Sequence, residues 1–487
     1  MKNINGKQDV KRQIFYLLLA ILILALIVLI PLPEALSRVR GAELTREGKL
    51  ALGVLLFALI LWITEAIPFH ITGLFCLFLL AAFRVDTFVS LVRTGFGNHI
   101  IVFFIGVLVL SAFITRSGLG RRISVFILSR TGNSTRMILL GFLVTGTLIS
   151  MWITDMAVAA MLMPLAVAIL KEEGCEPLKS KFGKGLLIAT AWGSIIGGIG
   201  TPSGAGPNPL VIGFLKEMAG IDLTFPGWML FGVPSALLLI LPCWGVLLLF
   251  FPPEMRFLKK SRVDLKKEFK EFPPMDREEK VTLGVFLFTA VTWIATPWLE
   301  KISGISIPIS MPLVVSVTVF FLPGISSIGW KEVEREISWN SILLIVTGIS
   351  IGMSLYTTGA AEWLALALLG GIGNVHPFVQ VFAVVIIVSI LKVTFSSNTV
   401  TATIIIPILI ALAENLGIPP LVIIIPAGLT SSMAFILVTS TPTNVIPYSA
   451  GYFSIRDMAL SGTVFTIIGS AVVSISIYVI GLLTGLY

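Results

Sequence analysis

A dense cluster of polar residues interrupts an apolar stretch near residue 400. Residues 394–407 read Thr-Phe-Ser-Ser-Asn-Thr-Val-Thr-Ala-Thr-Ile-Ile-Ile-Pro, and seven of these fourteen side chains carry a hydroxyl or an amide. Polar side chains are costly at membrane depth unless they face a partner, a cavity or a ligand. A second cluster, from Thr154-Asp155-Met156 to Pro164, has the same layout earlier in the chain. A polar break that recurs in both halves of a membrane protein indicates the central site of a transporter.

The chemistry of the later cluster suits an anion. Ser397, Asn398 and Thr399 offer two hydroxyls, one amide and the backbone N–H groups that open the next helical arm, and a helix N-terminus favours negative charge. Backbone carbonyls near 439–443 would suit a small cation such as Na⁺. The alternative is that these serines and threonines bond to their own helix or to neighbouring helices.

The composition indicates a protein that lies mostly in lipid. The chain has 487 residues, of which 56% are hydrophobic and 12% charged, whereas globular proteins carry about 25% charged residues. The net charge of +8 comes from basic residues in loops between apolar spans, a pattern typical of membrane topology and not of nucleic-acid binding. Three scattered cysteines, and no nucleotide-binding or metalloenzyme motif, give no indication of a disulfide framework, a metal site or an enzyme.

The apolar segments predict an all-α polytopic membrane protein with about 11 transmembrane helices and two re-entrant hairpins. The expected spans are 14–31, 49–66, 68–83, 99–118, 184–214, 228–252, 281–298, 305–323, 340–358, 420–453 and 459–486. The hairpins are expected at 136–170 and 378–415, and the spans 184–214 and 420–453 are expected to be broken near Thr201-Pro202 and Thr439–Pro442.

The same order of elements occurs twice. Asn98-His99 matches Asn340-Ser341, the hairpins follow, and then Gly206-Pro207-Asn208 matches Pro442-Thr443-Asn444. An odd number of crossings separates the matched elements, which predicts an inverted repeat. A chance match of two apolar stretches is the alternative, but the shared order of three features argues against it.

The repeat and the charges predict the division of the chain. We expect N-terminal scaffold helices in 1–98, a first repeat in 99–252, a cytoplasmic linker in 253–280, scaffold helices and a connector in 281–339, and a second repeat in 340–487. The distribution of Lys and Arg predicts a cell-membrane protein with a cytoplasmic N-terminus and an external C-terminus.

Three motifs carry a resemblance to a known family. The segment Trp62-Ile63-Thr64-Glu65-Ala66-Ile67-Pro68, the Ser397-Asn398-Thr399 tip and the break Thr441-Pro442-Thr443-Asn444 together resemble the divalent anion/sodium symporter (DASS) family, in order along nearly the whole chain. The resemblance implies a homodimer with scaffold and elevator-type transport domains. It also implies a di- or tricarboxylate substrate of the succinate, malate, fumarate and 2-oxoglutarate class, held between two Ser-Asn-Thr tips beside sodium sites, with no other cofactor.

The first tip departs from the family pattern. Thr154-Asp155-Met156 stands where the family has Ser-Asn-Thr, so that Asp155 brings a negative charge and Met156 offers no useful hydrogen bond. In the second copy Val393 stands where the first has Ser150, and Lys392 places an ammonium group inside an apolar arm. Sodium binding therefore remains an open expectation, but both expected cation sites lack some of the side-chain ligands of the family pattern. Lys392 either compensates the substrate charge, or snorkels or pairs with Asp155 as a structural bridge.

We therefore expect a secondary carrier of dicarboxylates that works by alternating access. Ser397, Asn398 and Thr399 are expected to bind one carboxylate, and Thr154 with the backbone of Asp155 and Met156 the other. The walls are expected from Gly204–Asn208, including Pro207, and from Thr441, Pro442, Thr443 and Asn444, and the candidate sodium ligands are Ser150, Thr154, Gly204 and Ser397. The fixed charge of Lys392 favours sodium-independent exchange. Sodium symport is the first alternative, and an intramembrane enzyme using Asp155 and Lys392 as acid and base is the second.

Overall fold

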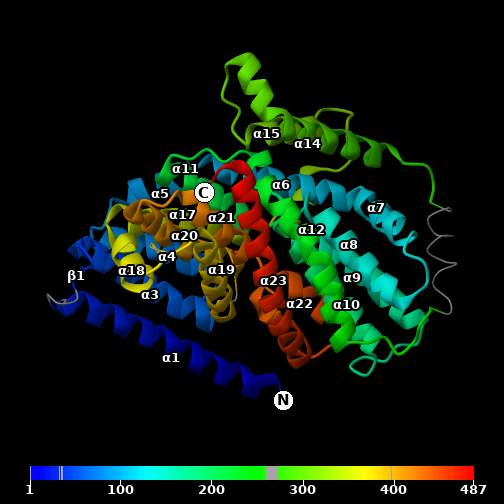
Figure 1. The fold of residues 1–487 in the computed structure, drawn as a ribbon, viewed down its shortest axis with the longest axis horizontal. Coiled ribbons are helices and arrows are strands. Elements are labelled where there is room, and N and C mark those ends of the chain that lie inside the picture. The colour runs from blue at the N-terminus through cyan, green and yellow to red at the C-terminus, as the bar shows by residue number, and fades with distance from the viewer. Residues whose placement is uncertain are drawn as a thin grey trace.

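The protein is a bundle of helices (Figure 1). The computed structural model describes residues 2–31, 33, 37–258, 272–373, 375–395 and 397–486. Within these ranges the only strands are β1 (Arg38–Val39) and β2 (Ala42–Glu43), which form a short antiparallel ribbon. The middle of the expected charged linker, residues 259–271, lies outside the described residues.

The helices fall into two series of the same order. The first series is preceded by α1 (Lys2–Leu29) and contains α3 (Arg46–Thr64), α4 (Phe69–Ala82), α5 (Phe88–Phe96), α6 (His99–Arg116), α7 (Leu119–Leu128), α8 (Thr135–Ser150), α9 (Asp155–Glu172), α10 (Lys181–Gly198), α11 (Pro207–Ala219) and α12 (Phe225–Phe250). The second contains α14 (Arg277–Ser303), α15 (Met311–Phe320), α16 (Trp330–Glu334), α17 (Trp339–Thr357), α18 (Ala360–Leu369), α19 (Pro377–Thr394), α20 (Asn398–Leu416), α21 (Pro420–Ser431), η1 (Val438–Ser440), α22 (Pro442–Tyr448) and α23 (Ile455–Thr484).

The fold class predicted from the sequence is confirmed. Nine helices among the described residues are long and apolar enough to cross a membrane: α1, α3, α6, α12, α14, α17, α19, α20 and α23. Both expected hairpins are present as helix pairs, α8–α9 and α19–α20, and both expected breaks separate two helices, α10 from α11 and α21 from α22. The chain is an all-α, multi-pass membrane protein.

Four short helices were not expected from the apolar segments: α5, α7, α16 and α18. Helix α7 illustrates the reason, because Arg121 and Arg122 in its first turn give it the appearance of a charged loop. Its buried residues Val125 and Leu128 lie on the side that packs on α8. Tertiary contacts therefore stabilise a helix that hydropathy alone does not identify.

Each contact between a helix of the first series and one of the second has a counterpart in which the two series change roles. Helix α6 packs against α15 as α17 packs against α4, and α9 packs against α22 as α20 packs against α11. Helices α12 and α23, the last of each series, lie side by side (Figure 1). Each hairpin therefore contacts the broken helix of the other copy, which is the arrangement that brings both polar clusters to one place.

Glycines let the first hairpin approach its neighbour closely. Helices α8 and α10 pack so tightly that a Cβ on Gly193 would lie 2.9 Å from Leu143 Cα, and one on Gly146 would lie 2.9 Å from the carbonyl carbon of Gly193. The Thr147 hydroxyl donates to Gly193 O across this contact (3.2 Å). Small residues allow such packing where no hydrophobic effect holds helices together in lipid. The end of α8, and with it the first tip, is thereby fixed against α10.

Candidate functional site

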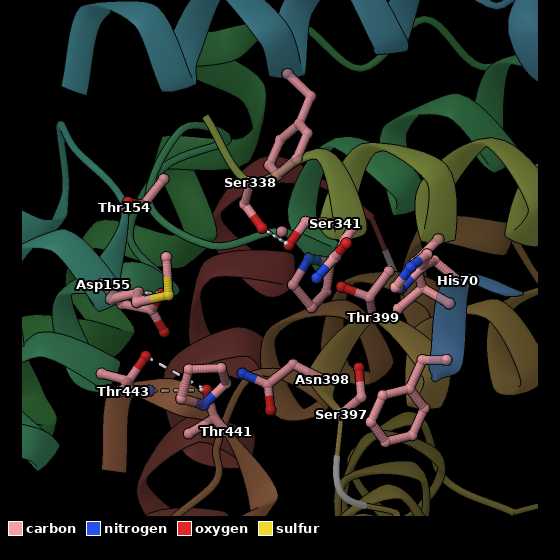
Figure 2. A pocket seen from close by; sticks show the side chains of 18 of the residues that line it. His70, Thr154, Asp155, Ser338, Ser341, Ser397, Asn398, Thr399, Thr441 and Thr443 are labelled. Atoms are coloured by element: carbon pink, nitrogen blue, oxygen red, sulfur yellow. Dashed lines mark hydrogen bonds between the residues drawn. The ribbon is translucent and has the colours of Figure 1, made fainter. Parts of the chain in front are cut away.

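The two polar tips line one cavity. Thr154, Asp155 and Met156 come from the first hairpin, and Ser397, Asn398 and Thr399 from the second, around a space of about 360 Å³. Figure 2 shows Thr154 and Asp155 on one side of this space and Asn398 and Thr399 on the other. Ligand pockets typically occupy about 300–1,000 Å³, so the cavity has the size of a small-molecule site.

The second tip presents free hydrogen-bond donors. Helix α20 begins at Asn398, where the Ser397 hydroxyl caps it by accepting from the Val400 N–H (3.4 Å). Within the described part of the chain, the backbone N–H groups of Asn398 and Thr399 have no protein acceptor. The side-chain oxygen Oδ1 of Asn398 is also buried without a partner. Unpaired donors at a helix N-terminus, lining a cavity, are suited to an anion.

The first tip uses its donors internally. Helix α9 begins at Asp155, whose N–H donates to Gly204 O (2.9 Å). The next N–H, that of Met156, donates to Oδ1 of the Asp155 carboxylate (2.8 Å). In this structure a carbonyl and the protein's own carboxylate therefore engage the two N–H groups that were expected to bind a substrate carboxylate.

The first break approaches the first tip closely. A Cβ added to Gly204 would lie 2.6 Å from both Ser150 O and Gly198 O, so only glycine fits at this point. The Ser150 hydroxyl is fully buried beside it and has no hydrogen-bond partner among the described residues. Two of the four candidate sodium ligands, Ser150 and Gly204, thus lie behind the first tip, whereas Thr154 and Ser397 line the cavity.

The second break supplies part of the cavity wall. Thr441, Pro442 and Thr443 line the cavity, as Pro207 does from the first break. The Thr441 hydroxyl caps α22 by accepting from the Thr443 N–H (3.4 Å), and it donates to the Thr443 hydroxyl (3.3 Å). Helix α22 packs against α9, so the second break lies against the first tip, and Figure 2 shows Thr443 on the same side of the cavity as Asp155.

Two expected wall residues are absent from the cavity lining. Asn208 and Asn444 are fully buried, and their amides bind carbonyls of the breaks that precede them. Asn208 donates to Gly198 O and Thr201 O at 2.8 and 2.7 Å. Their motif marks the breaks correctly, but their role in the structure is to hold the broken segments in shape.

Lys392 also lies outside the cavity. Its side chain is 3% exposed, and its ammonium nitrogen donates to Ser440 O (3.1 Å) and Phe395 O (3.4 Å). Asp155 affects it only as a charge at longer range, and no direct ion pair joins these two described residues. A structural Lys392–Asp155 bridge is therefore not formed. The enzyme alternative required Asp155 and Lys392 to act together as acid and base, and these two side chains are not in direct contact.

The remaining residues of the cavity wall come from three helices that the sequence predicted as spans but not as part of the site. These residues are Pro68, Phe69 and His70 at the start of α4, Phe104 and Leu108 of α6, and Ser338, Asn340, Ser341 and Leu344 at the start of α17. Asn340 had been identified only as a marker of the repeat. Its counterpart Asn98 instead caps α6 and donates to Glu217 (3.2 Å). His70 follows the Trp62–Pro68 motif, in which Trp62 Nε1 donates to Phe69 O (3.1 Å) and fixes the turn.

The cavity has exposed residues in its lining, and the helices that begin at it are joined at their far ends. Pro68 and Asn340 are exposed, whereas the tip residues are buried or, in Met156 and Ser397, half-buried. Helices α11, α17 and α20 all begin at the cavity, and their far ends meet where the Tyr356 hydroxyl donates to Glu414 (2.6 Å) and to Met218 O (3.2 Å). At 1.5 Å per residue, Tyr356 lies roughly 18 Å along α17 from Leu344.

Solved structures of two transporters share this fold. The YdaH transporter of Alcanivorax borkumensis matches with a TM-score of 0.51 and 15% identity, over 82% of this chain and 88% of that one. MtrF of Neisseria gonorrhoeae, described as representing a class of antimetabolite efflux pumps, matches with the same TM-score and identity over 77% of this chain and 80% of that one. At this identity the likeness concerns the fold alone.

Sequence comparisons are more specific. A chain from Staphylococcus saprophyticus named sodium-dependent dicarboxylate transporter SdcS is 31% identical over 457 residues, which cover 90% of this chain and 86% of that protein. The protein of the same name from Staphylococcus aureus strain USA300 is 29% identical over 453 residues with the same coverage. The family model described as the sodium:sulfate symporter transmembrane region matches residues 11–484. The chain therefore belongs to this symporter family, the divalent anion/sodium symporters, and is a transporter and not an enzyme.

Proposed function

We propose that the protein transports small dicarboxylates across a membrane together with sodium ions. The observation that supports this most directly is the second tip, where the N–H groups of Asn398 and Thr399 lie at the cavity without acceptors among the described residues. The relatives named sodium-dependent dicarboxylate transporters match along 90% of the chain. A dianion of the succinate, malate, fumarate or 2-oxoglutarate class has one carboxylate for these donors and a second that reaches across the cavity.

The second carboxylate would meet the Thr154 hydroxyl rather than the backbone of the first tip. Thr154 is the N-cap of α9 and makes no side-chain capping bond, so its hydroxyl is available. Asp155 stands directly beside it with a carboxylate of its own. Positive charge is needed here to offset two neighbouring carboxylates.

Sodium is a natural source of that charge. The names of the relatives favour sodium-coupled symport over the sodium-independent exchange expected from the sequence. Hard cations prefer oxygen ligands. Such oxygens are present at the unpartnered Ser150 hydroxyl, in the adjacent backbone at Gly204, and in the Asp155 carboxylate. We propose that a transported sodium ion binds behind the first tip, with Thr154 as the candidate ligand on the cavity side. Ser397, the remaining candidate, lies on the second tip across the cavity.

Alternating access would proceed by movement of the hairpins and broken helices relative to the other helices that line the cavity. We propose an elevator-type movement of this unit in a homodimer, following the family resemblance. The exposed Asn340 in the cavity lining and the far-end contact of Tyr356 with Glu414 support one of the two access states. A cytoplasmic N-terminus and an external C-terminus complete the proposed topology.

Uptake of labelled succinate into proteoliposomes tests the proposal. Uptake into vesicles without internal dicarboxylate, driven by an inward sodium gradient, is the expected result. Exchange against internal dicarboxylate that is unchanged by sodium would overturn the symport assignment and restore the exchange expectation. Uptake of sulfate with no competition by succinate would overturn the substrate class.

A further inference from the structure

Lys392 occupies a cage of backbone carbonyl oxygens. It lies in the last turn of α19, where its ammonium nitrogen donates to Ser440 O (3.1 Å) and Phe395 O (3.4 Å). One carbonyl belongs to the chain that leaves the hairpin arm, and the other to the 3₁₀ turn of the second break. Carbonyls at helix C-termini and in unwound segments are the groups that coordinate cations in carriers with broken helices. The ammonium group therefore stands where such a cation would be bound.

The space around the Lys392 ammonium group is small. It measures about 10 Å³ and is lined by Ser389, Val393, Ser440, Thr466 and the segment 433–436. This is about the lower limit for one water molecule. The positive charge of the lysine would repel a sodium ion placed in this space.

The two copies differ at this point in a complementary way. The hairpin tips align Asp155 with Asn398, which places Ile149 opposite Lys392 and Ser150 opposite Val393. The first copy thus has a neutral Ile149 and a buried hydroxyl without a partner at Ser150. The second has a fixed ammonium group at Lys392 and no hydroxyl at Val393. One copy is arranged for a mobile cation, and the other already contains a permanent one.

We propose that the Lys392 ammonium is the permanent cation of the second copy, so that the protein transports its substrate with one sodium ion fewer than a carrier with two open cation positions. The inference rests on the proposed sodium-coupled transport. It assigns Lys392 as a positioning residue, because its contacts join the second tip to the second break without reaching the cavity. The charge acts on the substrate through Phe395 and Ser440, which precede Ser397 and Thr441 of the cavity wall.

The double variant Lys392→Ile with Val393→Ser gives the second copy the residue pair of the first. We expect its succinate uptake to require one more sodium ion per substrate than the wild type, measured from the reversal of flux at fixed membrane potential. Lys216→Met is the matched control, because Lys216 pairs with Asp222 at the exposed end of α11, and it should leave the coupling ratio unchanged. An unchanged ratio in the double variant would overturn the inference.

A binding measurement covers the case in which the double variant does not transport. A ligand that binds only the folded protein raises its melting temperature in proportion to the logarithm of its concentration. In detergent without substrate, we expect the Tm of the double variant to rise more steeply with sodium concentration, against a choline control, than that of the wild type. Equal slopes would overturn the inference. A wild type that moves no dicarboxylate would overturn the proposed function, while the difference in sodium slopes would still test Lys392.

Discussion

Asn208 and Asn444 make the same two hydrogen bonds in the two copies of the repeat. Each side-chain amide donates to the carbonyls that lie ten and seven positions earlier, Gly198 and Thr201 for the first and Ala434 and Leu437 for the second. The distances run from 2.7 to 3.1 Å. Carbonyls released where a helix breaks at membrane depth need such partners, so the two asparagines keep both breaks in one conformation.

Asn208→Ala should destabilise the folded protein. The change removes both amide hydrogen bonds and the acceptor of the Ser432 hydroxyl (3.5 Å). It leaves the buried Gly198 O without its donor, whereas Thr201 O keeps the Gly204 N–H (3.2 Å), which corresponds to a loss of about 1–3 kcal/mol. Thermal unfolding in detergent should therefore show a clear loss of Tm, with Asn444→Ala behaving similarly. Asn415→Ala is the matched control, since its amide makes one exposed hydrogen bond with Glu362 (2.7 Å). An equal loss of Tm in that control would contradict the role assigned to Asn208.

The two tips should contribute unequally to substrate affinity. Asn398→Ala removes an amide at the tip with free N–H donors, and we expect KM for succinate to rise at least about tenfold, or 1.4 kcal/mol. Thr154→Val keeps the shape of the first tip and removes one hydroxyl, for which we expect a rise of about fivefold, since a single hydrogen bond contributes about 1 kcal/mol. Initial rates of labelled uptake measure both. A larger effect at Thr154 would reverse the assigned order.

Removing the charge of Asp155 should affect anion and cation in opposite directions. Asp155→Asn keeps an oxygen that can accept from the Met156 N–H but removes the negative charge beside the cavity. The substrate dianion should then bind more tightly, by about three- to tenfold, because a like charge is lost. The sodium concentration for half-maximal uptake should rise, because an oxygen ligand becomes neutral. Both values come from uptake at varied succinate and sodium concentrations. If the affinities for succinate and for sodium both rose or both fell, this explanation would be excluded.

The Tyr356–Glu414 contact should hold the far end of the site closed. Tyr356→Phe removes the hydroxyl that donates to Glu414 and Met218 O, which should increase the population of the other access state. A cysteine at exposed Asn340 reports this change, because it lines the cavity in the state described. Labelling of Asn340→Cys by a membrane-impermeant thiol reagent should slow by about two- to tenfold in the Tyr356→Phe background, for a shift of about 0.4–1.4 kcal/mol.

Thr357→Val provides the control for that experiment. Its hydroxyl donates only within α17, to Met353 O and Ser354 O, at 2.9 and 3.5 Å. The labelling rate of Asn340→Cys should be the same with and without Thr357→Val. If Tyr356→Phe likewise left the rate unchanged, the far-end contact would have no part in closing the site.

Sequence patterns alone determined the helical class, the two hairpins, the two breaks and the identity of both tips. These features depend on local hydropathy and on polar or proline interruptions, which are properties of neighbouring residues. The order of motifs also identified the repeat. The short helix α7 was missed because its arginines hide a packed face formed by Val125 and Leu128.

Only the tertiary structure decided how the polar groups are used. Asp155 and Met156 were expected to present backbone donors to the substrate, but Gly204 O and the Asp155 carboxylate occupy them. Asn208 and Asn444 were expected in the cavity wall and instead bind carbonyls of the breaks, while His70 and Asn340 entered the wall from distant helices. Each of these N–H groups donates to the acceptor that the fold places next to it, and which acceptor that is depends on which segments meet in space. That information belongs to the packing of the two copies and not to either stretch of sequence.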